Sequence, residues 1–110
     1  MKNICLTMML LFMSTVAFAS ERETSPLSTI SRLVSYSKFG NGDIYVRLAK
    51  PATQCAGYYV SLNSTGFKAT LSMLIAAYQA KTNIRITGYI NNKWSGSSNY
   101  VCEIYAVTYG

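Results

Sequence analysis

The stretch CAGYYVSLNSTGFKATLSMLIAAYQAKTNIRITGYI, residues 55–90, contains the change of periodicity that decides the fold. Apolar side chains alternate over residues 55–62, which predicts a strand with one buried face. Helical spacing follows and predicts a helix from Phe67 to near Lys81 whose apolar face packs on a sheet. That face consists of Phe67, Leu71, Leu74, Ile75 and Tyr78. Alternation returns over residues 83–90, which predicts a further strand.

The flanking sequence adds three more strands. Residues 29–38 and 43–49 both alternate, and Gly40-Asn41-Gly42 between them is typical of a tight hairpin turn. A polar loop over residues 91–99 precedes the last predicted strand, residues 100–108. The order is therefore three strands, a helix and two strands. It predicts a mainly β domain with one helix over residues 29–110, an OB-fold whose five-stranded barrel has the helix between strands three and four.

The N-terminal residues have a different composition. Residues 1–19 combine an early lysine, a short apolar run and the small-residue pattern Ala17-Phe18-Ala19. This pattern predicts a signal peptide that is cleaved after Ala19. The alternative, a membrane helix, needs about 20 apolar residues, more than this run contains. We therefore expect a secreted or periplasmic protein without membrane insertion. Residues 20–28 are polar and contain a proline, which we interpret as a loose N-terminal arm.

Two cysteines remain after the leader, Cys55 and Cys102. A pair of cysteines in an exported chain indicates a disulfide. The alternative is a metal-binding or redox pair, which usually shows a CxxC spacing or accompanying histidines. The chain has neither. We expect no metal and no cofactor.

The net charge is +6, with ten basic and four acidic residues. Such a charge is compatible with nucleic acid, anionic lipid or acidic glycans as partners. The basic residues are scattered, however, and scattered charges are equally typical of an ordinary solvated surface. A nucleic-acid partner is therefore not favoured.

Catalysis is not expected. The chain has no histidine, the most common general base, and its four acidic residues form no pair suited to acid–base work. Binding is the remaining class of function. Nine tyrosines, one tryptophan and many serines and asparagines are suited to packing on sugar rings or protein surfaces.

The predicted helix carries small apolar residues on the side turned away from its packing stripe. These residues are Ala69, Met73, Ala76 and Ala80. A helix on a protein surface usually has a polar outer side. We therefore predict that a second copy of the helix packs here. The alternative is that alanine simply favours helices and tolerates exposure.

Several of these segments resemble a known family. Phe67, Leu71 and Ala77, followed by Asn83-Ile84-Arg85-Ile86 and Trp94, are similar to the helix–strand–Trp segment of the B subunits of subtilase cytotoxin and typhoid-type toxins. Gly42-Asp43-Ile44 and the position of Cys55 also resemble that family. The resemblance implies a secreted OB-fold that forms a ring of five with helices lining its centre. It also implies binding of sialylated host glycans and delivery of a separate enzymatic subunit.

The resemblance also suggests a ligand site. The family's sialic-acid serine on the first strand matches Ser31, and Arg32 next to it could contact a carboxylate. Tyr89 lies closest to the family's aromatic position. Trp94, in the loop between the last two strands, is a second candidate because OB-folds often bind ligands there. The competing hypothesis is a stand-alone secreted OB module that binds a protein or an anionic polymer.

Overall fold

The structure is a computed structural model that describes residues 21–110. The predicted signal peptide, residues 1–19, lies outside the described residues. Within the described part of the chain, no helix has the length and hydropathy needed to cross a membrane.

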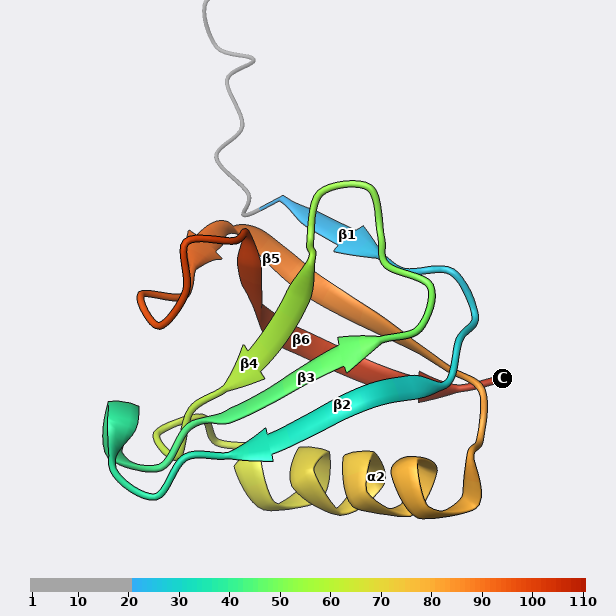
Figure 1. Cartoon of the computed structure of the whole chain (residues 1–110), viewed down its shortest axis with the longest axis horizontal. Coiled ribbons are helices and arrows are strands. Elements are labelled where there is room, and N and C mark those ends of the chain that lie inside the picture. The colour runs from blue at the N-terminus through green and yellow to red at the C-terminus, as the bar shows by residue number, and fades with distance from the viewer. Residues whose placement is uncertain (1–20) are drawn as a thin grey trace, which may run out of the picture.

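One six-stranded sheet and one long helix form the domain (Figure 1). Its elements in chain order are β1 (Arg22–Thr24), β2 (Ile30–Ser35), the 3-10 helix η2 (Phe39–Asn41), β3 (Ile44–Leu48), β4 (Gly57–Val60), α2 (Phe67–Ala80), β5 (Ile84–Lys93) and β6 (Val101–Tyr109). The strand order is β1-β5-β6-β4-β3-β2. Strands β4 and β6 are parallel, and the other neighbours are antiparallel. Figure 1 shows α2 along the bottom of the sheet and the edge strand β1 at the top of the molecule.

The prediction of a mainly β domain with one helix is confirmed. The helix follows the third predicted strand and precedes the fourth. The sheet itself is open, because its ladders leave β1 and β2 as edges. An isolated bridge between Ser28 and Ile84 lies beside this opening.

The prediction of a loose N-terminal arm is wrong. Residues 22–24 form β1 and pair with residues 87–89 of β5. The Glu23 carboxylate accepts hydrogen bonds from the backbone N–H groups of Gln54 and Cys55 at 2.9–3.1 Å. Ser25 and Ser28 are both buried, and Ser25 Oγ accepts from the Ile86 N–H at 2.9 Å. The polar side chains of this segment bind backbone groups of the sheet, which is why a polar sequence is ordered here.

The core forms between the sheet and α2. Val46, Ile84, Ile86, Leu74 and Ala77 are fully buried there. The buried face of α2 differs from the predicted stripe: Leu74 and Ala77 form its centre, while Ile75 and Tyr78 are 46% and 42% exposed. Relative to the predicted stripe, the helix is therefore rotated so that the small Ala77, not Ile75 or Tyr78, faces the sheet.

Register irregularities also change which side chains face the core. A bulge between Ile30 and Arg32 of β2 places Leu33 against the core, although alternation from Ile30 predicted Val34. One extra residue in a strand reverses the facing of everything after it. The predicted tight hairpin is instead the longer turn of η2, where Gly40, Asn41 and Gly42 all have positive φ.

The centre of the sheet holds a disulfide and a buried tyrosine. Cys55 and Cys102 form the predicted disulfide, with Cα atoms 5.6 Å apart. Beside them, burial and the negative charge of Glu23 raise the pKa of Tyr58 to about 12. Tyr58 therefore remains neutral throughout the physiological pH range.

Candidate ligand-binding sites

Trp94 is buried, although it belongs to the polar segment that was predicted to be a ligand-binding loop. Its side chain is only 5% exposed. It packs in a group of rings that we call the aromatic cluster, which consists of Tyr36, Phe39, Tyr45, Tyr59 and Trp94. Trp94 stacks on Tyr45 and on Tyr59, with ring centroids 5.7 and 5.8 Å apart. These two tyrosines face each other across β3 and β4.

Asp43 anchors the aromatic cluster. Its Oδ2 accepts a hydrogen bond from Trp94 Nε1 at 2.8 Å, and the carboxylate is only 5% exposed. Gly40 allows this arrangement, since a Cβ there would lie 2.1 Å from the Asp43 carboxylate. Burial raises the pKa of Tyr59, and the negative charges of Glu103 and Asp43 raise it further. The cluster is thus a closely packed wall of rings with the Asp43 side chain bound inside it.

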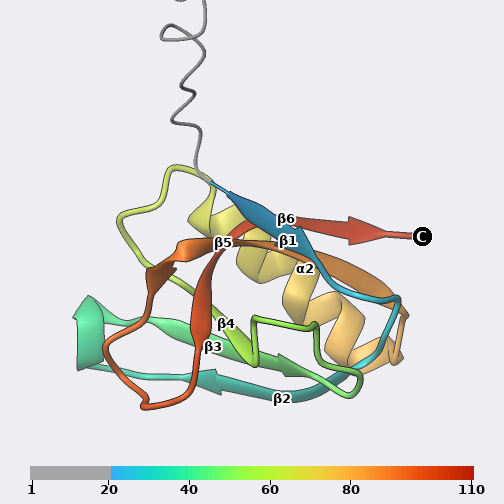
Figure 2. The ribbon, with the colours of Figure 1, turned by 90° about the horizontal axis from the view of Figure 1, so that it is seen from above.

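A cleft lies against this wall, and we call it the arginine cleft. Its volume is about 210 Å³. It is lined by two arginines, three rings and the β5–β6 loop: Arg32, Arg47, Tyr36, Tyr45, Trp94, Gly96, Ser97 and Asn99. Figures 1 and 2 show η2 and the β5–β6 loop at the same end of the molecule.

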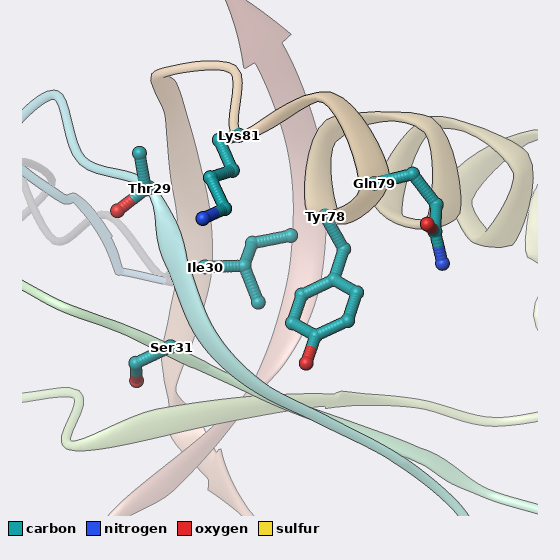
Figure 3. A pocket seen from close by; sticks show the side chains of 6 residues that line it. All are labelled: Thr29, Ile30, Ser31, Tyr78, Gln79 and Lys81. Atoms are coloured by element: carbon teal, nitrogen blue, oxygen red, sulfur yellow. The ribbon is translucent and has the colours of Figure 1, made fainter.

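A second, larger pocket lies between β2 and the C-terminal end of α2, and we call it the helix pocket. Its volume is about 460 Å³, and its lining residues are Thr29, Ile30, Ser31, Tyr78, Gln79 and Lys81. Figure 3 shows the Tyr78 ring and the Lys81 side chain extending from the helix toward Ile30, while Gln79 points away. Ser31 Oγ donates a hydrogen bond to the Arg47 carbonyl at 3.1 Å. Toward a ligand, the hydroxyl oxygen can therefore only accept a hydrogen bond.

The four predicted ligand residues therefore do not form one site. Ser31 lines the helix pocket, whereas Arg32 and Trp94 line the arginine cleft. Tyr89 lines neither of these. It packs edge-on against Tyr105, at 5.4 Å between centroids, and the Arg22 guanidinium lies 4.2 Å from the Tyr105 ring. The family resemblance assigned Ser31 and Tyr89 to one ligand site, but they lie on β2 and β5, which are not paired with each other.

Sequence reasoning missed most of both sites. Arg47, Ser97 and Asn99 belong to the arginine cleft, and Tyr78, Gln79 and Lys81 belong to the helix pocket. The pairing of β2 with β3 brings Arg32 opposite Arg47, which a reliable strand register could have revealed. No signal in the sequence indicates that the end of α2 lies beside the start of β2.

The predicted interface residues are partly accessible in the single chain. Ala69, Ala76 and Ala80 are exposed, and Met73 is half-buried. The Met73 carbonyl accepts a hydrogen bond from the Tyr109 hydroxyl at 2.7 Å.

The comparison with known proteins identifies no family for this chain. The chain matches no protein-family model, and no curated protein matches it significantly. Among the described residues, no group of three or more histidine, cysteine, aspartate or glutamate side chains is placed to hold a metal ion.

Proposed function

We propose that this protein is an exported, non-catalytic binding subunit that recognises acidic, sialylated glycans and assembles as a homopentamer. The observation that carries the proposal is the helix pocket, which combines an aromatic ring, a cation and hydrogen-bonding groups. Tyr78 offers a face for a sugar ring, Lys81 a charge for a carboxylate, and Gln79 and Thr29 hydrogen bonds for hydroxyls. Its volume lies within the range of about 300–1,000 Å³ usual for small-molecule sites.

The proposed architecture is an OB barrel. The residues between β1 and β2 support it, since Ser25 and Ser28 bond to Ile86 and Ile84 of β5. The chain from β1 to β2 thus runs beside β5 before it joins β3, which would close the sheet into a barrel. The parallel pairing of β4 with β6 supports the same proposal.

Export is supported by the disulfide, because such bonds persist in oxidising compartments. A signal peptide in residues 1–19 is part of this proposal. The toxin-type B subunits that the sequence resembles would add one further partner, a separate enzymatic subunit. The competing function is a stand-alone module that binds a protein or an anionic polymer.

The helix pocket is tested by replacing Lys81 with glutamine. We expect binding of a sialylated oligosaccharide to weaken about tenfold or more, because a hydrogen bond to a charged group contributes about 1.5–3 kcal/mol. Lys68→Gln is the matched control, as Lys68 is exposed on the same helix but outside the pocket. Calorimetry with sialylated and asialo forms of one oligosaccharide measures the effect.

Three results would contradict the glycan proposal. They are equal binding of the sialylated and asialo forms, equal losses in Lys81→Gln and Lys68→Gln, and no binding by the wild type. The last result would favour the stand-alone module.

The assembly is tested by Ala76→Glu. Ala76 is exposed on the outer side of α2 in the single chain, so the substitution leaves the fold of one subunit intact. In a close contact between helices, the unpaired carboxylate would cost several kcal/mol. We expect light scattering to show a wild-type oligomer and a folded Ala76→Glu monomer. A wild type that remains monomeric at high concentration would refute the pentamer.

A further inference from the structure

We propose that the arginine cleft binds a tetrahedral oxyanion ester, a sulfate or a phosphate, carried on a sugar. This site shares no lining residue with the helix pocket, and the inference does not depend on the function proposed there. It rests on the charge of the cleft, on its hydrogen-bonding groups and on the rigidity of its wall.

The charge of the cleft favours the binding of an anion. Arg32 and Arg47 are directly opposite each other on β2 and β3, and both are exposed. Like charges that oppose each other across two strands are destabilising. No acidic side chain is among the described residues that line the cleft. A bound anion would therefore neutralise a repulsion that the fold otherwise retains.

The geometry favours a tetrahedral group over a carboxylate. Two guanidinium forks approach from neighbouring strands, and each can donate two parallel hydrogen bonds. An esterified sulfate or phosphate has three free oxygens that point in different directions, whereas a carboxylate has two in one plane. Ser97 adds a further donor: its Oγ already accepts from the Asn99 N–H at 3.0 Å, which leaves its O–H free to donate.

The size of the cleft limits what enters it. At about 210 Å³ it is smaller than the sites of roughly 300–1,000 Å³ that enclose whole small molecules. The charged group of a sugar would enter, and the ring would remain at the mouth.

The wall of the cleft is preorganised. The Asp43 carboxylate holds Trp94, and Lys93 Nζ donates to the Ser97 carbonyl at 3.1 Å. Gly96 passes so close to Trp94 that a Cβ would lie 2.6 Å from the ring. A site that is ordered before binding loses less entropy when the ligand enters.

The same wall disfavours nucleic acid. Single strands usually bind by stacking their bases on exposed aromatic rings. Here Trp94 is buried and stacks on Tyr45 and Tyr59, so it offers no open face for a base. A phosphate could enter the cleft, but Trp94 would not stack on the base that follows it.

Trp94 provides the readout, because it is the only tryptophan in the chain and forms part of the cleft. Its fluorescence is titrated with glucose 6-sulfate, glucose 6-phosphate, glucuronate and glucose. A short thymidine oligonucleotide is added as a fifth probe. Arg47→Gln and Arg32→Gln each remove one guanidinium, and Arg85→Gln on β5 removes the same charge outside the cleft. Thermal melting checks that each variant is folded.

We expect one or both esters to bind, and their relative affinities distinguish sulfate from phosphate. Each cleft variant should bind the ester about tenfold more weakly than the wild type, while Arg85→Gln should bind it like the wild type. Three outcomes would overturn the proposal: glucuronate binding as tightly as the esters, Arg85→Gln losing as much affinity as Arg47→Gln, and no ester binding by the wild type. An arginine-dependent preference for the oligonucleotide would also overturn it and assign the cleft to nucleic acid.

Discussion

Replacing Trp94 with alanine is expected to lower the free energy of unfolding by about 3–5 kcal/mol, the range typical of a buried aromatic residue. Trp94 is 5% exposed and contacts four other rings of the aromatic cluster. Its loss leaves a cavity and removes the hydrogen bond donor of Asp43, whose carboxylate is buried. Urea unfolding followed by far-ultraviolet circular dichroism measures the effect, since the fluorescent residue is gone.

Two further variants show which contacts of Trp94 account for the loss in free energy of unfolding. Trp94→Phe retains an aromatic ring but leaves Asp43 Oδ2 without its donor, so an intermediate loss is expected. Tyr105→Ala is the exposed control: Tyr105 is 51% exposed, and its loss should cost less than about 1 kcal/mol. If Trp94→Ala costs no more than Tyr105→Ala, the aromatic cluster is not a source of stability. A large loss also means that Trp94→Ala cannot serve as a test of ligand binding.

Removing the disulfide by the double substitution Cys55→Ala and Cys102→Ala is expected to cost about 4 kcal/mol. The bond joins residues 47 positions apart, and closing a loop of that length restricts the unfolded chain by about this amount. It connects the residues before β4 to β6, where the two strands run parallel. For a small domain this is a large share of a total stability of about 5–15 kcal/mol.

Urea unfolding followed by Trp94 fluorescence measures this loss. Wild-type protein treated with a reducing agent is the control, because it lacks the bond but keeps both side chains. Both samples should unfold at the same lowered urea concentration. An alanine variant that is as stable as the oxidised wild type would show that the crosslink does not stabilise the fold.

Local patterns were sufficient for most elements of the fold. The predicted helix from Phe67 to near Lys81 is α2, Phe67–Ala80, and the predicted strand over residues 43–49 is β3, Ile44–Leu48. These segments could be predicted because their periodicity depends on near neighbours in the chain. The disulfide could be predicted for a simpler reason, since the two cysteines outside the predicted signal peptide allow one pairing.

The candidate sites depended on contacts between distant segments. Residues 22–24 carry no apolar alternation, and only their pairing with β5 makes them a strand. The environment of Trp94 is likewise set by rings on three other segments, although its own loop is polar.

By itself, the sequence determined the class of the fold, its helix, most of its strands and its disulfide. Tertiary structure alone decided the bulge in β2, the rotation of α2 and the meeting of Arg32 with Arg47. The physical reason is register: moving a strand by one residue turns its side chains to the other face, and pairing across the sheet selects that register. The arginine cleft lies where such a pairing brings distant residues together, and the helix pocket lies where the end of α2 packs beside β2.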